Sequence, residues 1–525
     1  MMKIETKKQN IRIEFLIGLL VGILVLNSCS DDNVLALEPF NQISEEAAFS
    51  TPELVELSVT GLYNAAQIGI YSGTFGRGYP FGAAFIQQGD NRGEDVVNVA
   101  TFYQFTYTAT YDPTTANNVF YWSDTYRLIN RANIVLEGVE TALSNDIISQ
   151  EVANDYMGQA KFLRAAAHLE LMWHFAKPYN DTPDASHLGV PYRDFAITTQ
   201  ESIDLALTLG RNTTAECYQK IIADFDDAEA LLNSKAERGG ILGLIRATKE
   251  AAIAYKTRAY QHMGDWQMVI AEANKLDGIY ELTIAPNDVF ENGYSNSESI
   301  FSIEHTAENN PGVNAALGSQ YNRRGLVVIS PIVWRNPLWL ADDLRREEGA
   351  LVTTRDGVKY TNKYKDDVNY TDPAPVIRYA EVLLNLAEAY ARENDPNNAL
   401  TYLNRVRNRS LVDPATQAYE NGDFATQTEL VNGIIDERRF EFVMEGRRWP
   451  DIHRLQNDDF VEIDGIPAKV ANGTPPADAY TLGTPYDGPF GVNPVLYNDT
   501  EFLWPIPQQE INNNPTLAQQ QNLGW

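Results

Sequence analysis

Apolar and polar side chains recur along much of the chain with the 3.6-residue period of an α-helix. Residues 375–393 show this pattern most clearly, with one apolar and one polar face. The apolar face holds Val376, Ala380, Leu383, Leu384, Ala387, Tyr390 and Ala391, and the polar face holds Arg378, Glu381, Asn385, Glu388 and Arg392. Within the polar face, Glu388 and Arg392 form an i,i+4 pair in the favourable order, which further favours a helix.

The same period predicts further helices, and one of them has a clear start signal. The predicted helices cover 115–142, 149–177, 213–236, 247–275, 375–393, 396–409 and 427–447, with another from about residue 51. At Thr51-Pro52-Glu53, an N-cap hydroxyl, a proline at the first helical position and an acidic first turn follow one another. The sequence therefore predicts a mainly α protein.

Two helix pairs have matching sequences. Ala259-Tyr260 and Ala389-Tyr390 each lie near the end of a first helix, which leads through a polar turn, Gly264-Asp265 or Asn394-Asp395, into a second helix. This helix–turn–helix unit resembles the tetratricopeptide repeat. The sequence between the two pairs is mostly non-helical, so the prediction is a scaffold of helical pairs and not a regular solenoid.

Three long stretches lack helical patterning. Residues 68–112 and 277–370 are rich in Gly, Asn, Asp and Tyr, and residues 457–500 are rich in Pro, Gly and Asp. Loops of this length in a compact protein are usually functional or disordered. The many aromatic residues of the first two stretches argue against disorder, which leaves function as the interpretation.

The N-terminus carries an apolar run that ends at a cysteine. Residues 15–26 are apolar or glycine, and Lys3, Lys7, Lys8 and Arg12 precede them. This run suits a secretory signal but is short of the roughly 20 residues that span a bilayer. It ends in Leu26-Asn27-Ser28-Cys29, which resembles the lipobox of bacterial lipoproteins, where the cysteine is acylated and becomes residue one. An ordinary signal peptide that contains a cysteine is the alternative.

These observations predict the domain organisation. A lipoprotein signal peptide is expected at 1–28, a lipidated Cys29 with a tether at 29–37, and a single globular domain at 38–525. The domain divides into an N-terminal part at about 38–235 and a C-terminal part at about 247–525. Asp31 and Asp32 resemble the acidic export signal of Bacteroidetes-type surface lipoproteins, so the predicted location is the outer membrane, facing the exterior. A lipid anchor would hold the protein on the membrane without spanning it.

Charge and cysteine content narrow the function classes. The 525 residues have a net charge of -30, and the chain from Cys29 onward has -32, because residues 1–28 hold four basic and two acidic residues. Such a charge repels nucleic acid, so a neutral ligand or a well-solvated exterior fits better. Cys217 is the only other cysteine and is expected to be a buried thiol.

The sequence shows no catalytic or metal-binding motif. Its six histidines form no HExxH, and His168 and His174 are six apart, which places them on different faces of a helix. No P-loop, dinucleotide fingerprint or Gly-x-Ser-x-Gly occurs. A binding protein without cofactor or metal is therefore expected, although paired carboxylates for glycoside hydrolysis stay open because such pairs are spatial.

The cluster of Glu and Arg at 437–448 has a structural interpretation. Arginine forks paired with carboxylates lock helix ends together. Gly446 is expected to let the chain turn out of its helix toward Trp449-Pro450.

Several segments together resemble one family, over the whole stretch from Cys29 to Trp525. They are GDNRGEDVV (89–97), YRLINRANIVLEGV (126–139), GQAKFLRAAAHLELMWHFAKPY (158–179), GVPYRD (189–194), SESIFSIEH (297–305), DDLRR (342–346), PVIRYAEVLLNLAEAYAR (375–392), IIDERRFEFVMEGRRWPDIHRL (434–455) and LWPIPQQEINNNPTLAQQQNLGW (503–525). In this order they resemble the SusD/RagB family of Bacteroidetes outer-membrane lipoproteins. The departures are Leu523, where the pattern usually has Pro, and Asn394, where a repeat usually has Gly.

The resemblance implies both a fold and a function. The expected fold is mainly α, with tetratricopeptide-like helical pairs forming a scaffold, a loop-rich half and few short strands. The expected function is a surface lipoprotein that captures a nutrient, usually an oligosaccharide, and delivers it to a SusC-like TonB-dependent transporter. A peptide-capturing member, a surface glycoside hydrolase and a tetratricopeptide-type adaptor are the alternatives.

Aromatic residues of the loops are the expected ligand platforms, because a flat ring stacks on the C–H face of a sugar while amides and carboxylates fix its hydroxyls. The candidate ligand-binding residues are Tyr79, Asp90, Asn91, Tyr103, Tyr294, Tyr321, Trp334 and Trp339. Trp334 and Trp339 lie in PIVWRNPLWLADD, where exposure is expected, with packing of Trp339 beside Leu340 as the alternative. Trp122 and Trp173 lie in helical patterns and are expected in the core.

Overall fold

The computed structural model describes residues 45–71, 74–75 and 77–525, so the predicted signal peptide, Cys29 and the tether lie outside the described residues. The helices are α3 (Glu45–Ala48), α4 (Pro52–Gln67), α5 (Ala84–Arg92), α6 (Gln104–Tyr107), α7 (Ala116–Ser144), α8 (Gln150–Phe175), α9 (Gln200–Ala206), α10 (Thr214–Leu231), α11 (Lys235–Arg238), α12 (Leu242–Ile245), α13 (Lys249–Met263), α14 (Trp266–Asn274), α15 (Pro331–Trp334), α16 (Tyr379–Arg392), α17 (Pro396–Arg409), α18 (Pro414–Gln417), α19 (Gln427–Phe442), α20 (Arg448–Arg454), α21 (Gln508–Asn513) and α22 (Pro515–Ala518). The strands are β1 (Ile70–Tyr71), β2 (Thr74–Phe75), β3 (Val96–Asn98), β4 (Ser299–Ile303), β5 (Val327–Ile329), β6 (Val352–Arg355), β7 (Val358–Thr361) and β8 (Ala374–Arg378).

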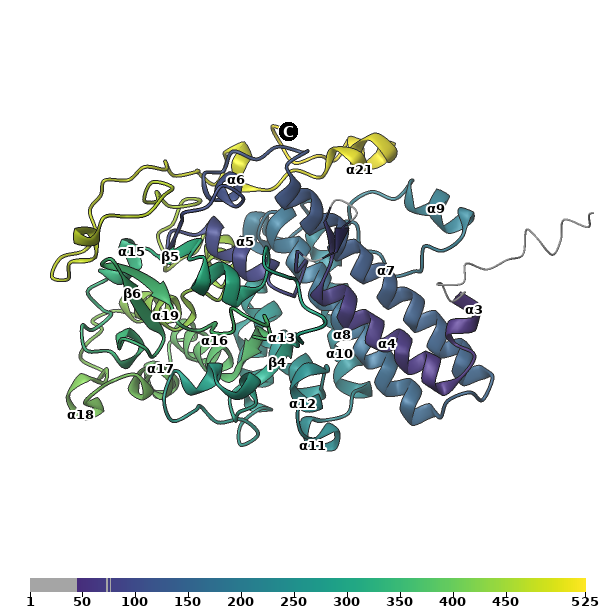
Figure 1. Ribbon diagram of the computed structural model, residues 1–525, viewed down its shortest axis with the longest axis horizontal. Coiled ribbons are helices and arrows are strands. Elements are labelled where there is room, and N and C mark those ends of the chain that lie inside the picture. The colour runs from purple at the N-terminus through teal and green to yellow at the C-terminus, as the bar shows by residue number, and fades with distance from the viewer. Residues whose placement is uncertain (1–44, 72–73, 76) are drawn as a thin grey trace, which may run out of the picture.

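Long helices form one half of the molecule, and loops with short elements form much of the other (Figure 1). Helices α4, α7, α8 and α10 pack against one another at one end, and α13, α16 and α19 continue the helical layers toward the loop-rich half. The predicted start signal of α4 is confirmed, since the Thr51 hydroxyl accepts a hydrogen bond from the Leu54 amide and Pro52 is the first helical residue. The mainly α fold with few short strands is therefore confirmed. No helix within the described ranges is both long and apolar enough to cross a membrane.

The two predicted helical pairs are α13–α14 and α16–α17, and they share one turn geometry. Gly264 (φ 73°) and Asn394 (φ 60°) both adopt the left-handed conformation, which glycine and asparagine tolerate best. The next residue in each, Asp265 or Asp395, caps the second helix through its carboxylate. Asn394 thus replaces the usual glycine without changing the turn.

Some predicted helix boundaries are wrong. Residues 375–378 form strand β8, which pairs antiparallel with β4, and the helix begins only at Tyr379. Within 247–275 the predicted turn at Gly264-Asp265 is confirmed, since it separates α13 from α14, but the helix from 427 ends at Phe442 instead of 447. Met444 (φ 67°) and Gly446 (φ 73°) leave the helical region, so the chain turns toward α20, as expected for Gly446.

The described strands pair only in twos, all antiparallel: β1–β2, β3–β5, β4–β8 and β6–β7. Two of these pairs join distant parts of the chain. In β3–β5, Val97 pairs with Val328, and in β4–β8, Phe301 pairs with Ile377. The loop-rich half is thereby fastened to both the N-terminal and the C-terminal part of the chain.

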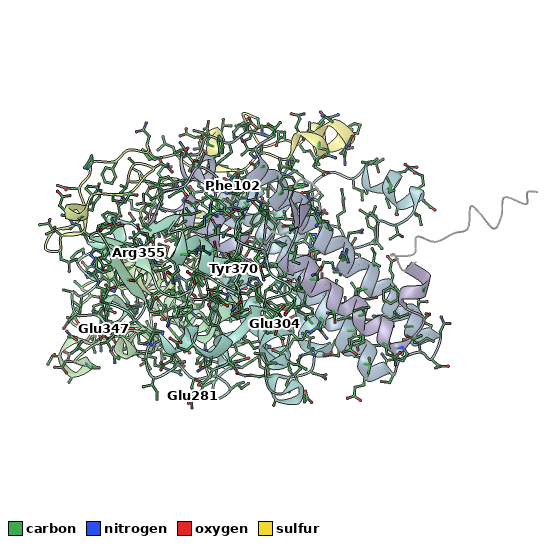
Figure 2. The ribbon with its side chains drawn as sticks, viewed as in Figure 1. Phe102, Glu281, Glu304, Glu347, Arg355 and Tyr370 are labelled. Carbon is green, nitrogen blue, oxygen red and sulfur yellow. The ribbon has the colours of Figure 1, made fainter. Side chains whose placement is uncertain are left out.

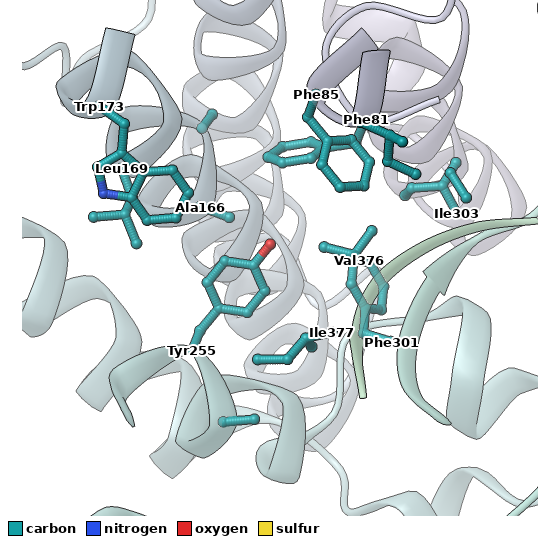
Figure 3. Packing of buried hydrophobic residues seen from close by; sticks show 14 of the residues in the cluster. Phe81, Phe85, Ala166, Leu169, Trp173, Tyr255, Phe301, Ile303, Val376 and Ile377 are labelled. Carbon is teal, nitrogen blue, oxygen red and sulfur yellow. The ribbon is translucent and has the colours of Figure 1, made fainter. Parts of the chain in front are cut away.

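One hydrophobic core extends through both halves of the sequence. Phe162 of α8 meets Tyr255 of α13 and Phe301 of β4 edge-on, with ring centroids 5.2 Å and 5.1 Å apart. Figure 3 shows Tyr255 of this core between Leu169 on one side and Phe301 on the other, with strands at the right of the view beside Phe301. The continuity supports the predicted single domain over 38–525, which stays a prediction.

Arginines and carboxylates of the 437–448 cluster lock the C-terminal elements together, as expected. Arg438 donates to Asp451 of α20 at 3.0 Å, and Glu437 accepts from Arg345 at 2.7 Å. The predicted pair of Glu388 and Arg392 also forms, at 2.9 Å. The cluster is therefore structural, since its charged groups are buried or largely buried and most of them pair with charged groups of other elements.

Candidate functional site

A groove of about 470 Å³ lies in the loop-rich half, within the size range of small-molecule sites. Nearly all of its lining comes from residues 470–491, which we call the binding loop, in the yellow-green region at the upper left of Figure 1. The lining residues are Arg335, Val470, Ala471, Asn472, Gly473, Thr474, Pro475, Pro476, Asp478, Ala479, Tyr486, Gly488 and Pro489.

The binding loop is fastened to the β3–β5 pair. Asn98 at the end of β3 accepts the Gly473 amide through its backbone carbonyl at 2.9 Å and donates its side-chain amide to Asn472 Oδ1 at 2.7 Å. Farther along the loop, the buried Tyr480 donates its hydroxyl to the Ile329 carbonyl of β5 at 2.8 Å. Because both contacts reach strands of the core, the loop is held although it has little regular structure of its own.

Arg335 and the Tyr486 ring also line the groove, and Phe490 packs beside that ring. The Arg335 guanidinium donates to the Thr484 carbonyl at 2.8 Å and lies 5.7 Å from the Tyr486 ring. Tyr486 donates its hydroxyl to the Pro489 carbonyl at 2.8 Å, which fixes its ring. Phe490 meets that ring edge-on at 5.7 Å and is 49% exposed. The groove thus has an oriented aromatic platform beside solvent.

The chemistry of the lining suits an uncharged, hydroxyl-rich ligand. Tyr486 offers a flat ring for stacking, and the side chains of Asn472, Thr474 and Asp478 offer amide, hydroxyl and carboxylate groups. Asp478 is the only carboxylate among the lining residues, and none of them is His or Cys. The lining can therefore bind and orient a sugar, but it does not itself supply the carboxylate pair of a glycosidase.

All eight predicted ligand-binding residues are buried. The exposed fractions of Tyr79, Asp90, Asn91, Tyr103, Tyr294, Tyr321, Trp334 and Trp339 lie between 0% and 5%. The expected exposure of Trp334 and Trp339 is wrong: their rings pack edge-on at 5.7 Å, with the Arg346 guanidinium within 4.5 Å of each. Trp339 also stacks on Phe440 of α19, so this apolar run faces the core. As predicted, Trp122 and Trp173 lie in the core.

Asp90 braces two distant segments in the described structure. Its carboxylate accepts the Tyr321 hydroxyl at 2.7 Å and the Gly446 amide at 2.8 Å. Burial raises the pKa of Asp90 to about 7, although both donors lower it. The neighbouring Asn91 donates its amide to the Gln87 carbonyl within α5. Ligand roles for these residues stay predictions, and the contacts seen here are structural.

A smaller aromatic surface lies in the first predicted loop region. The Arg77 guanidinium lies 5.0 Å from the ring of Phe102, which is partly exposed, and Phe105 is 47% exposed. Figure 2 shows Phe102 near the top of the view, apart from Arg355 and Tyr370 of the middle region. The groove is the stronger candidate, because it combines an aromatic ring with a cavity and several polar side chains.

The histidines and the cysteine are structural in the described part of the chain. His168 contacts the Arg164 carbonyl, and His174 contacts Arg92, so the two rings have different partners, as expected. Cys217 is buried, as predicted, and burial raises the pKa of its thiol to about 12. Residues 45–71, 74–75 and 77–525 contain no group of three or more His, Cys, Asp or Glu placed to hold a metal ion.

Sequence reasoning missed three residues that line the groove: Tyr486, Arg335 and Asn472. A signal existed, because Tyr486 and Asn472 lie in the Pro-, Gly- and Asp-rich stretch 457–500, whose length is typical of a functional or a disordered loop. The larger number of aromatic residues in 68–112 and 277–370 directed the choice of binding residues to those stretches, where most of the chosen rings are buried in the core. Arg335 is next to Trp334, but its guanidinium is brought to the groove by a loop about 150 residues away.

Known proteins resemble this chain along nearly its whole length. The family model described as SusD family matches residues 345–525, and the model described as starch-binding associating with outer membrane matches residues 42–261. The SusD-like proteins P2 and P25 of Formosa agariphila are each 25% identical, over 76% and 96% of this chain and 79% and 98% of their own lengths.

Solved structures share the fold. A SusD superfamily protein from Bacteroides fragilis is 27% identical with a TM-score of 0.74, covering 89% of this chain and 99% of that one. The surface glycan-binding protein A from Bacteroides uniformis is 20% identical with a TM-score of 0.67, covering 90% of this chain and 99% of that one. At 20% identity, the similarity to the Bacteroides uniformis protein shows a shared fold and no more.

Proposed function

Because this chain belongs to the SusD/RagB family, we propose that it is an outer-membrane-associated binding protein that captures an oligosaccharide in the groove of the binding loop. The observation that carries the proposal is the partly exposed Tyr486 ring, set beside Asn472, Thr474 and Asp478 in a groove of about 470 Å³. After capture, the ligand would pass to a SusC-like TonB-dependent transporter, the partner expected for this family.

The relatives' descriptions support a glycan as the ligand. One matching family model is described as starch-binding, and one protein of the same fold is named a surface glycan-binding protein. The net charge of -30 also fits a neutral sugar better than an anionic ligand. A peptide-capturing function is the second candidate, and the open shape of the groove and its proline-rich lining are compatible with an extended chain.

Tyr486→Ala is expected to weaken glycan binding about tenfold, because it removes the stacking surface and leaves the polar groups in place. The measurement is calorimetry of the protein against a panel of oligosaccharides and peptides. Tyr402→Ala, which changes a partly exposed ring on α17 outside the groove, should leave the affinity unchanged.

Other results would redirect or overturn this proposal. Equal affinities of the Tyr486→Ala protein and the native protein for the best glycan would move the site away from the groove, and a loss in Phe102→Ala would place it on the smaller aromatic surface. Binding of peptides alone would favour the second candidate. Turnover of any glycan would make the protein an enzyme, as in the glycoside hydrolase alternative.

Lipid anchoring through Cys29 remains part of the proposal. Cys29→Ala should move the protein from the membrane fraction to the soluble fraction, because the acyl chains would provide the membrane affinity. Fractionation of cells with detection of the chain measures this. Continued firm membrane association of the Cys29→Ala protein would show that the anchor lies elsewhere, and protease treatment of intact cells would test the proposed exterior orientation.

A further inference from the structure

A second cavity, of about 260 Å³, lies between the first half of α7, α9 and the C-terminal helices α21 and α22. Figure 1 shows α9 and α21 at the upper right, on the opposite side of the view from the binding loop. The segment 191–197, between α8 and α9, completes the lining. The cavity shares no lining residue with the groove, so it is a separate candidate site.

Two aromatic rings of α7 line one side of this cavity and are held in place. Trp122 and Tyr126 lie one helical turn apart, with ring centroids 4.8 Å from each other, and Trp122 packs edge-on against Phe175 at 4.8 Å. The Tyr126 hydroxyl donates to the Pro191 carbonyl at 2.7 Å, which fixes that ring. Rings fixed in this way offer an apolar surface that does not have to be ordered when a ligand binds.

Helix α9 supplies apolar side chains to the same cavity. Ile203 and Leu207 line it one turn apart, and each is 39% exposed, so the cavity has an apolar rim beside solvent. The chain after α9 is held by Asn514 of α21–α22 and by Arg193, which donate to the Leu209 carbonyl at 2.8 Å and 3.3 Å. An apolar ligand group would therefore be enclosed between α7 and α9.

The two asparagines of the lining are satisfied within the protein. Asn130 donates to the Ile197 carbonyl at 3.2 Å and accepts the Ile197 amide at 2.7 Å. Asn514, besides its donation to Leu209, accepts the Leu517 amide at 2.9 Å. These amides hold the walls of the cavity and are not available to a ligand.

Two charged groups of the lining are available. The Glu510 carboxylate accepts no hydrogen bond from any residue that the structure describes. Arg193 donates through Nη2 alone, to the Ala206 and Leu209 carbonyls, so its Nε and Nη1 make no hydrogen bond within the described part of the chain. Although both groups line one cavity, no ion pair joins Glu510 and Arg193 there.

This combination indicates the chemistry of a ligand. An unpaired carboxylate binds an ammonium group, and an arginine binds a carboxylate, both through charge-assisted hydrogen bonds. The fixed rings and the α9 side chains bind an apolar group. The volume of 260 Å³ exceeds the roughly 150 Å³ of an apolar cavity that holds benzene, so it admits a phenyl or branched alkyl group with a small charged head.

We propose that the cavity between α7, α9 and α21 is a second binding site that takes a free α-amino acid with an apolar side chain. The ligand ammonium lies on Glu510, its carboxylate on Arg193, and its side chain against Trp122 and Tyr126. The site goes beyond the glycan function proposed for the groove and does not depend on it.

Other ligand classes leave part of this site unused. An oligosaccharide has no charge for Glu510 or Arg193. A fatty acid or an aryl carboxylate pairs with Arg193 but leaves the Glu510 carboxylate unpaired, and an aryl amine does the reverse. A buried charge left without its partner weakens binding, so the two analogues that each lack one charge are the sharpest test of the class.

Calorimetry of the native protein with four small molecules tests the proposal. The ligands are L-leucine, L-phenylalanine, 2-phenylethylamine, which lacks the carboxylate, and 3-phenylpropionate, which lacks the ammonium. We expect both amino acids to bind. The amine and the carboxylate should each bind at least tenfold more weakly than L-phenylalanine, because each leaves one charged group of the cavity unpaired.

Three variants locate the site. Glu510→Gln keeps the shape of the side chain and removes its charge, so it should weaken L-phenylalanine binding at least tenfold. Ile203→Trp should abolish binding, because the larger ring fills the cavity from its exposed rim. The matched control is Glu201→Gln, which removes an exposed carboxylate from the first turn of α9 outside the lining and should leave the affinity unchanged.

Four results would overturn the proposal. Neither amino acid could bind the native protein at millimolar concentration. Either analogue could bind as tightly as L-phenylalanine. Glu510→Gln could keep the native affinity. Tyr486→Ala could lose the amino acid, which would place that ligand in the groove. If Glu510→Gln or Ile203→Trp fails to fold, the comparison of analogues on the native protein still decides.

Failure of the groove function gives a different result. Loss of glycan binding in every assay would leave the amino acid affinities untouched, because the two sites share no residue. Absence of amino acid binding together with glycan binding that depends on Tyr486 would remove the second site and leave the proposed function intact.

Discussion

Replacing Arg378 with methionine is expected to lower the free energy of unfolding by about 3–5 kcal/mol, because it leaves buried carboxylates without their partner. The guanidinium contacts Glu298 and Glu441 at 2.6 Å each and Glu445 at 3.0 Å. These contacts join β8 to α19 and to the segment before β4. Burial alone would raise the pKa of Glu441, but Arg409, Arg378 and Arg345 together hold it well below its ordinary value.

Chemical denaturation of the native and Arg378→Met proteins at neutral pH measures this effect. The matched control is Lys220→Met, which removes one partner of an exposed ion pair with Asp194 at 2.6 Å. That change should cost less than about 1 kcal/mol, since solvent screens exposed pairs. A similarly small decrease in the free energy of unfolding in both variants would mean that neighbouring arginines compensate for Arg378. The buried ion pairs of Arg378 would then not be essential for stability.

Gly446→Ala is the second change with a large expected effect, a loss of about 2–5 kcal/mol. Two costs add at this position. The residue has a φ of 73°, which costs an alanine about 1–2 kcal/mol. An added Cβ would also lie 2.6 Å from Ile86 Cα and 2.8 Å from the Phe85 carbonyl oxygen, where the backbone of α5 cannot move without shifting the helix.

Gly264→Ala separates these two costs. Gly264 has the same φ of 73°, but an added Cβ there meets nothing within 4 Å. Its loss should be about 1–2 kcal/mol, from conformational strain alone. Thermal unfolding of both variants gives the comparison, and an equal loss in the two would show that α5 moves freely away from residue 446. In that case the Asp90 contact to the Gly446 amide should also be dispensable, so Asp90→Asn should cost little.

Sequence reasoning located local features well and long-range ones poorly. The helix 396–409 has the predicted bounds, because its start at Asp395-Pro396 and its apolar face are both local signals. Residues 375–378 were assigned to the wrong element, because a helical period and a short buried strand look alike over four apolar-rich residues. The pairing of β8 with β4, about 75 residues away, decides between them.

The candidate site shows the same division more strongly. The sequence left 457–500 as either a functional or a disordered loop, and the aromatic residues chosen as platforms in another loop, such as Trp334 and Tyr321, are buried. An aromatic side chain in a loop has the same sequence signature whether it faces solvent or the core. Whether such a ring is exposed or buried depends on the residues that the fold places against it. Trp339 is buried against Phe440, and the Tyr321 hydroxyl donates to the buried Asp90.

By itself, the sequence determined the mainly α class, the two tetratricopeptide-like pairs, the structural nature of the 437–448 cluster and the resemblance to the SusD/RagB family, because these rest on periodicity, turn residues and motif order. The tertiary structure alone decided which rings are exposed and which loop forms a groove. These properties depend on contacts between residues hundreds of positions apart, such as Asn98 with Asn472, and burial is set by those contacts rather than by the local pattern of side chains.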